Sequence, residues 1–397
     1  MLVQQQETVA SIIKEALATL DVTDINIILD RPKSAEHGDI ACNIAMQLAR
    51  VLKQKPRDIA DKLVGLIKAN PKSQTLFKNI EIAGPGFINF FLADDARFET
   101  IRKILTDKEA YGFNHDHDGE SVLLEFVSAN PTGPLHLGHA RQGALGDTLA
   151  NLLQTQGWKV TREFYYNDAG VQINNLAESI RLRALELLGE NITLPESAYH
   201  GEYIVSIAKE YLAKKPVHTH NGDVIASEGD LNDINSIRRY GVAYLRNEQD
   251  DDLNALGVHF DNFYLESSLY SSGRVQAAVE NMIKSGYTYE QDGALWLRTT
   301  ACEKLGIHDD KDRVMKKADG TYTYFVPDVA YHLAKFERGF TKAVNIQGSD
   351  HHGTIARVRC GLQCVSKVLD WNIPKAFPDY ILHKMLSVVK DGEPVKM

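Results

Sequence analysis

The chain has 397 residues, of which 44% are hydrophobic and 24% charged, a composition typical of a soluble globular protein. Its net charge of −9 disfavours a simple basic coat for nucleic acid, and four cysteines fit a reducing compartment better than a disulfide framework. No run approaches the roughly 18 consecutive apolar residues of a membrane helix, and the first residues do not resemble a secretory signal, so a cytoplasmic location without membrane contact is expected.

Residues 1–112 are expected to form a small α+β domain. Apolar residues from Val9 to Leu20 recur at helical spacing, and Asp24–Leu29 alternates like a strand. Helices are predicted for Ile40–Leu52 and Pro56–Ile67, and two strands for Ile80–Ala83 and Phe87–Leu92 around a Pro-Gly turn. The polar segment Phe113–Gly119 then predicts a linker.

A second domain is expected over 120–397. It begins with a buried strand, Val122–Val127, a loop, Ser128–Leu135, and a helix from Leu137 to about Gln156. The apolar face of this helix is assigned to Leu145, Leu149, Leu152 and Leu153. A strand over Lys159–Tyr165 completes a βαβ unit, which predicts a parallel, Rossmann-type α/β sheet that binds nucleotide.

The middle of this domain, about 174–293, is mostly helical in pattern and more polar, and is interpreted as an insertion. Sheet structure is expected to return in four later segments: Ala294–Leu297, Tyr322–Val326, Lys342–Ile346 and Tyr380–His383. Val388–Met397 has the pattern of a hairpin with an Asp-Gly turn.

The most specific chemical signal is Pro131-Thr-Gly-Pro-Leu-His136-Leu-Gly138-His139, between the first strand and the first helix of this domain. The carboxyl end of a strand beside a helix N-terminus is where α/β sheets bind phosphates. His136 and His139 lie on one helical face and can donate hydrogen bonds to a triphosphate. Gly138 leaves room for a flat base. An ordinary βα turn is the alternative.

His136-Leu-Gly-His139 resembles the HIGH signature of class I aminoacyl-tRNA synthetases, and the run from Glu125 to His139 resembles the arginine-specific members closely. The resemblance covers nearly the whole chain. It implies that Glu125 and Asn130 line an arginine pocket, with Asn130 on the amino group. The signature loop around them consists of Ser128, Ala129, Pro131, Thr132, Gly133, Pro134, Leu135 and Leu137.

The run Tyr322 to Lys335 resembles the segment that completes this arginine pocket. Asp328 would grip the guanidinium, because a planar group with five donors calls for carboxylates, and Tyr324 would pack or hydrogen-bond beside it. The family more often has Thr-Arg before this aspartate, where this chain has Val326-Pro327. A helix cap is the plain alternative for Asp328.

A third run, Gln347 to Gly353, resembles the turn that reads the ATP ribose, through Gly348 and Asp350. No role is assigned to Ser349, His351 or His352. These histidines, Cys360 and Cys364 could suggest a metal site, but the two cysteines are four apart within a helical run. Buried thiols are therefore expected, and neither a metal nor structural zinc.

The chain ends in Lys396-Met397, which matches the start of the family's KMSKS loop, and Lys396 would face the ATP phosphates. The resemblance therefore implies that the chain stops within this loop. The anticodon-binding domain that follows in the family would be absent. The N-terminal domain would contact tRNA, with basic residues around Arg31 to Ile40 as candidates.

The activity implied by the resemblance is that of a ligase, which forms arginyl-adenylate from L-arginine and ATP with Mg²⁺ and transfers arginine to tRNA(Arg). A monomer is expected, with tRNA bound before activation, and turnover by these 397 residues is expected to be impaired. The alternatives are a synthetase for another amino acid or a nucleotidyltransferase, and a non-catalytic RNA-binding or arginine-sensing relative. Glu125 and Asp328 argue against the first two, and intact His136 and His139 against the last.

Overall fold

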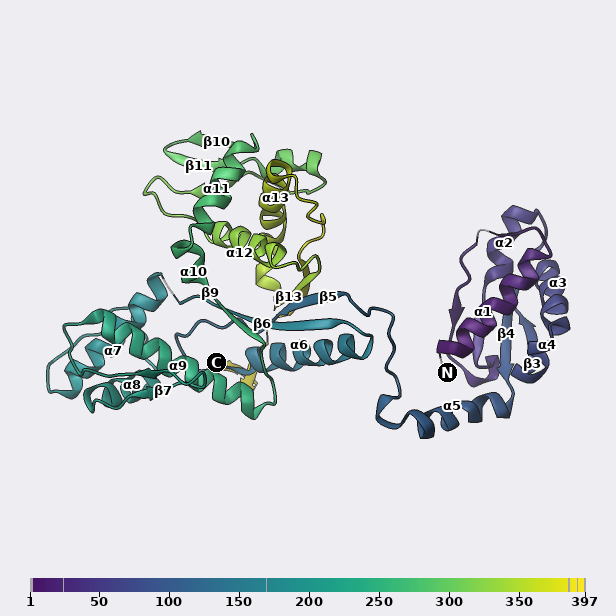
Figure 1. The fold of residues 1–397 in the computed structure, drawn as a ribbon, viewed down its shortest axis with the longest axis horizontal. Helices are drawn as coiled ribbons and strands as arrows, with labels where there is room; N and C mark the ends of the chain where they lie inside the picture. Colours follow the sequence, from purple (N-terminus) through teal and green to yellow (C-terminus); the bar gives the residue numbers. More distant parts are fainter. Residues whose placement is uncertain (1–2, 24, 169, 385, 391, 396–397) are drawn as a thin grey trace. The chain divides into compact units, whose positions relative to one another are not determined.

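A computed structural model describes residues 3–23, 25–168, 170–384, 386–390 and 392–395. The chain divides into two compact units, Met1–Phe113 and Asn114–Met397 (Figure 1). The division falls at the start of the polar segment at 113–119. Among the described residues, no helix combines the length and apolar composition needed to cross a bilayer.

The N-terminal unit packs helices against a four-stranded antiparallel sheet of order β1-β2-β4-β3. Its strands are β1 (Leu29–Asp30), β2 (Ile40–Cys42), β3 (Phe77–Ala83) and β4 (Phe87–Leu92). Its helices are α1 (Val3–Ala18), α2 (Ile44–Leu52), α3 (Pro56–Ala69), α4 (Pro71–Leu76) and α5 (Asp94–Asp107), with 3₁₀ turns η1 (Ala35–His37) and η2 (Lys108–Ala110). One core of apolar residues from α1, α2, α3 and the strands holds the unit together.

Two predictions in this unit are wrong in part. Ile40–Cys42 was expected to begin a helix but forms β2, because it pairs with β4 on one side and β1 on the other. The strand expected over Asp24–Leu29 is reduced to Leu29–Asp30, and Asp24 lies outside the described residues. Pairing partners distant in sequence decide both cases.

The second unit is built on five parallel strands in the order β14-β13-β5-β6-β9. These are β5 (Ser121–Glu125), β6 (Lys159–Tyr166), β9 (Asn262–Leu265), β13 (Ala343–Gly348) and β14 (Asp379–His383). The chain leaves β5 toward β6 and β9, and later places β13 and β14 on the other side of β5. The sheet therefore has its topological switch point between β5 and β13, where ligands bind in open α/β sheets.

Helices cover both faces of this sheet (Figure 1). On one face α6 (Leu137–Thr155) packs over Val122, Leu124 and Phe126, and on the other α12 (Phe325–Glu337) and α13 (His352–Leu369) pack in the cluster that holds Leu123. The buried residues of α6 are Gly143, Gly146 and Ala150, whereas Leu145 and Leu152 are exposed. The apolar face predicted for this helix is thus half wrong, because close packing on Phe126 selects small residues.

The insertion has its own core, formed by α7 (Val171–Leu187), α8 (Glu202–Leu212) and α9 (Ile234–Ala255), with the small hairpin β7 (Val217–His218) and β8 (Val224–Ile225). However, β9 lies within the segment 174–293 and is the fifth strand of the main sheet. Two helices, α10 (Glu266–Ser271) and α11 (Arg274–Lys284), then lead away from it. The insertion into the sheet therefore ends before Asn262.

Two of the four segments expected to rejoin the sheet do so, as β13 and β14. Ala294–Leu297 is β11 of a separate antiparallel sheet, between β10 (Thr288–Gln291) and β12 (Arg313–Lys316). In place of a strand over Tyr322–Val326, the structure has a bridge at Tyr322 and the start of α12 at Phe325. The remaining elements are the 3₁₀ turns η3 (Thr299–Leu305) and η4 (Ser349–His351) and the hairpin β15 (Val388–Lys390) and β16 (Glu393–Val395).

Candidate functional site

A cavity of about 350 Å³ opens at the carboxyl ends of β5 and β13, at the switch point of the sheet. It brings together six of the residues predicted from sequence: Glu125, Ser128, Asn130, Tyr324, Asp328 and Gly348. His136, Gly138, His139 and Asp350 are not part of its lining. A second cavity, of about 600 Å³, lies at the amino ends of β5 and β13, and none of the predicted site residues lines it.

Three carboxylates converge on this cavity, from Glu125, Asp328 and Glu266. Burial raises the pKa of Asp328 to about 7, and the neighbouring charges of Glu125 and Glu266 add to the effect. Burial also raises the pKa of Glu266, although the Tyr165 hydroxyl donates a hydrogen bond to it at 3.0 Å. A cation bound between acids that share one cavity stabilises their ionised forms and lowers their pKa.

Glu125 differs from the other two acids because it already has a cationic partner. Lys335 Nζ lies 2.6 Å from Glu125 Oε2, both side chains are buried, and Asn345 Oδ1 accepts from the same ammonium at 3.0 Å. The hydroxyl of Ser128 donates to Glu125 Oε1 at 3.1 Å. Asp328 and Glu266 are therefore the acids left for a ligand.

Sequence reasoning missed Glu266 and Lys335. Glu266 begins α10, in a stretch assigned to the insertion, and no motif surrounds it. Lys335 lies seven residues after Asp328 on α12, two helical turns along one face, and that spacing was the available signal. Tyr324 is the N-cap of α12, and Asp328 lies within the first turn of this helix. Pro327 is tolerated in the same turn because the first N–H groups of a helix have no intrahelical acceptor.

Tyr324 lies at the rim of the cavity rather than in its wall, since the residue is 84% exposed. Asn130 also lines the cavity, and its Nδ2 donates to Gln172 Oε1 at 2.7 Å. This bond orients the amide so that Oδ1 remains as an acceptor, which suits an ammonium group.

The loop between β5 and α6 starts in an unusual backbone conformation. Val127 and Ser128 have φ of 67° and 43°, in the left-handed region that β-branched residues rarely adopt. Ser128 Oγ anchors the turn, because it donates to Glu125 and accepts from the Tyr165 N–H at 3.2 Å. Residues held in such conformations cluster at functional sites.

His136 and His139 form a reciprocal cap at the start of α6. Gly138 N–H donates to His136 Nδ1 at 3.1 Å, and His136 N–H donates to His139 Nδ1 at 3.2 Å, with the two rings stacked 3.7 Å apart. A backbone N–H can only donate, so each Nδ1 is unprotonated and each neutral ring carries its hydrogen on Nε2. Burial and the nearby His136 lower the pKa of His139 to about 4, which keeps that ring neutral. The helix N-terminus thus offers two Nε2–H donors.

A side chain at either predicted glycine would meet a neighbouring side chain. A Cβ at Gly138 would lie 2.8 Å from the ring of His136, which folds back over it. A Cβ at Gly348 would lie 2.2 Å from Asp350 Oδ1, so this glycine lets the exposed carboxylate of Asp350 turn back to the end of β13. Beyond β14 the predicted hairpin forms as β15 and β16, whereas Lys396 lies outside the described residues.

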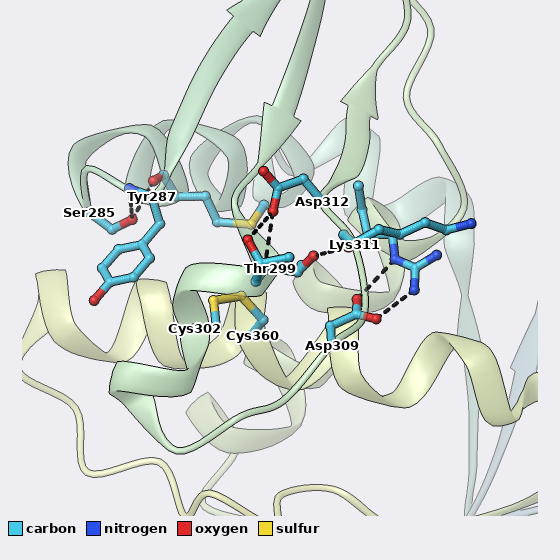
Figure 2. The surroundings of a disulfide bond; sticks show 11 residues. Ser285, Tyr287, Thr299, Cys302, Asp309, Lys311, Asp312 and Cys360 are labelled. Carbon is cyan, nitrogen blue, oxygen red and sulfur yellow. Dashed lines mark hydrogen bonds and ion pairs between the residues drawn. A yellow bond between two sulfur atoms is a disulfide. The ribbon is translucent and has the colours of Figure 1, made fainter.

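The expectation of free thiols is wrong for Cys360. It forms a disulfide with Cys302 of η3, which joins this turn to α13 (Figure 2). The buried Cys364 thiol lies on the same helix, and the three sulfur atoms are within 4.8 Å of one another. While two of them are bonded, they do not form a three-thiolate metal site. The two cysteines are 58 residues apart, and this spacing does not predict a disulfide.

Two family models match segments that together cover most of the chain. Residues 7–92 match the family model for the arginyl-tRNA synthetase N-terminal domain, and residues 100–397 match that for the catalytic domain of class I (R) tRNA synthetases. The chain belongs to the arginyl-tRNA synthetase family.

Curated relatives are similar along the whole chain. It is 56% identical over 400 residues to an arginine–tRNA ligase of Cupriavidus metallidurans, with 100% of this chain and 65% of the relative covered. An arginine–tRNA ligase of Ralstonia nicotianae is 54% identical with the same coverage. The chain thus spans about 65% of the length of these relatives.

Solved structures agree on the fold. A crystal structure described as an arginyl-tRNA synthetase from Campylobacter jejuni superposes with a TM-score of 0.63 at 36% identity, covering 75% of this chain and 62% of that one. The arginyl-tRNA synthetase of Thermus thermophilus superposes with a TM-score of 0.67 at 20% identity, covering 95% and 65%.

Proposed function

We propose that this chain contains the arginine-activating site of an arginine–tRNA ligase. The observation that carries the proposal is the acidic cavity at the switch point, where Asp328 and Glu266 remain for a cation while Lys335 neutralises Glu125. A guanidinium presents several donors in one plane and is the cation that such a pair of carboxylates fits. The names of the curated relatives support the same assignment.

In the proposed reaction the carboxylate of bound arginine attacks the α-phosphate of ATP in line, the bond to the β-phosphate oxygen breaks, and pyrophosphate leaves. Mg²⁺ bound to the phosphates would neutralise part of their charge. Asn130 would hold the α-ammonium group, and Asp350 the ribose hydroxyls. His136 and His139 would donate from Nε2 to the phosphates, at the helix N-terminus where anions are favoured. The chain then acts by positioning and charge stabilisation, without a covalent enzyme intermediate.

The N-terminal unit would contact tRNA(Arg), and tRNA would be needed for full activation. We also propose that a polypeptide of these 397 residues binds arginine and ATP but charges tRNA slowly. Steady-state charging at the rate of a full-length relative would contradict this second point alone.

Isothermal titration with arginine and with citrulline, each with ATP and with and without tRNA(Arg), tests the assignment. Citrulline has nearly the shape of arginine but no charge, so we expect binding of arginine only, and its loss in Asp328→Ala. Equal binding of both ligands, or of neither in the presence of tRNA, would overturn the proposed substrate.

A further inference from the structure

One fully buried side chain of the insertion forms hydrogen bonds with the signature loop. Gln249, on α9, is 0% exposed, and its Nε2 donates to the backbone carbonyls of Asn130, at 3.1 Å, and Gly133, at 2.8 Å. Both amide hydrogens are used, and both acceptors lie about 116 to 119 residues earlier in the chain.

A second insertion residue contacts the carbonyl between these two. Tyr203, on α8, donates its hydroxyl to Thr132 O at 2.8 Å. A Cβ at Gly133 would lie 3.3 Å from this hydroxyl oxygen, so the absence of a side chain at 133 lets the ring approach. Two helices of the insertion therefore supply donors to the carbonyls of residues 130, 132 and 133.

The loop 128–135 needs hydrogen-bond donors from other parts of the chain. It starts with the left-handed residues Val127 and Ser128 and contains Pro131 and Pro134, which have no N–H to donate. Its main internal backbone bond is Thr132 N–H to Asn130 O, at 2.8 Å. Partly buried carbonyls without a regular ladder must be satisfied by side chains or water.

We propose that Gln249 and Tyr203 are positioning residues, which hold the loop 128–135 so that Asn130 lines the cavity and α6 starts in a fixed orientation. The helical insertion is then part of the activation machinery although neither residue lines the cavity. The effect of these residues on catalysis rests on the proposed function. Their effect on the conformation of the loop does not.

The mechanical part is tested by hydrogen–deuterium exchange of the chain, followed in peptides that cover 128–139. Gln249→Met keeps the length of the side chain and removes both donors, and Tyr203→Phe removes one oxygen. Tyr240→Phe is the matched control, because its buried hydroxyl, on the same insertion, has no hydrogen-bond partner in the described part of the chain. We expect faster exchange of the loop in the first two variants only. Unchanged exchange, or equal acceleration in all three, would overturn the proposal.

The catalytic part is tested by arginine-dependent ATP–pyrophosphate exchange with tRNA(Arg) present. Displacement of a positioning element by about 1 Å can lower a rate by about 100-fold, so we expect kcat to fall about 10- to 100-fold in Gln249→Met, at a melting temperature near that of Tyr240→Phe. A normal kcat despite faster loop exchange would refute the catalytic role. A wild-type chain without arginine-dependent pyrophosphate exchange would refute the proposed function instead. Hydrogen–deuterium exchange of the loop would still show whether Gln249 and Tyr203 hold it in place. Tyr203→Phe keeps both tests decisive if Gln249→Met does not fold.

Discussion

At the scale of single residues, Asp328 controls how the cavity responds to pH. Its pKa is raised to about 7, by burial first and then by Glu125 and Glu266. The folded chain therefore holds a proton on this group between about pH 4 and pH 7 that the unfolded chain has released, so its contribution to stability falls as pH rises through that window. A bound guanidinium favours the anion, so binding releases the proton.

From this we predict that arginine binds about fivefold more weakly at pH 6 than at pH 7, since the fraction of ionised Asp328 falls by that factor. Isothermal titration at both pH values, with tRNA(Arg) present, measures the change. Asp328→Asn is the control, and should bind weakly with little dependence on pH over this range. Equal affinity of the wild-type chain at both values would show that Asp328 does not titrate there.

His139 gives a second prediction, of opposite sign. Its pKa is lowered to about 4, by burial and then by His136. Between about pH 4 and pH 6.5 the unfolded chain carries a proton that the folded chain lacks, so stability from this residue grows as pH rises through that window and is lost as pH falls. NMR titration of its ring, assigned with His139→Gln, should give a midpoint near 4. A midpoint near 6.5 would contradict the reciprocal cap.

At the scale of elements, the distance between α6 and the sheet depends on one glycine. A Cβ at Gly146 would lie 2.2 Å from the buried ring of Phe126, whereas one at Gly143, three residues earlier, meets its nearest atom at an ordinary 3.5 Å. Both are helical, so alanine would raise intrinsic helix propensity at each.

We therefore expect Gly146→Ala to destabilise the second unit by about 1–3 kcal/mol, the usual effect of overpacking. Gly143→Ala should be neutral or stabilise it by about 0.4–1 kcal/mol. Urea unfolding of the two variants beside the wild-type chain measures the difference. Equal stability of the two would mean that α6 moves away from Phe126 without cost.

At the scale of the whole molecule, the two units have separate cores, so their unfolding is expected to be separable. Leu63 is fully buried in the core of the first unit, and Leu124 in the sheet of the second. Each leucine-to-alanine change should destabilise its own unit by about 2–5 kcal/mol. Scanning calorimetry should show one of two transitions shifting in each variant. A shift of both transitions by either substitution would indicate a single cooperative unit.

Features that depend on neighbours along the chain could be predicted from the sequence. Helical periodicity identified α1 and α3, and the strand–loop–helix order placed His136, Gly138 and Asn130 beside the end of a parallel strand. The run from Glu125 to His139 indicated the family, and the separate run from Tyr322 to Lys335 indicated Asp328. These signals are local, because backbone conformation and the position of a helix N-terminus depend on a few consecutive residues.

Features that depend on partners distant in sequence could be seen only in the folded chain. It made Ile40–Cys42 a strand, added β9 to the sheet and buried glycines rather than leucines on α6. It also paired Glu125 with Lys335 and brought Glu266 to the cavity. Periodicity reports that one face of an element is buried but not which element covers it, and the charge near a carboxylate depends on groups that only folding brings within a few ångströms.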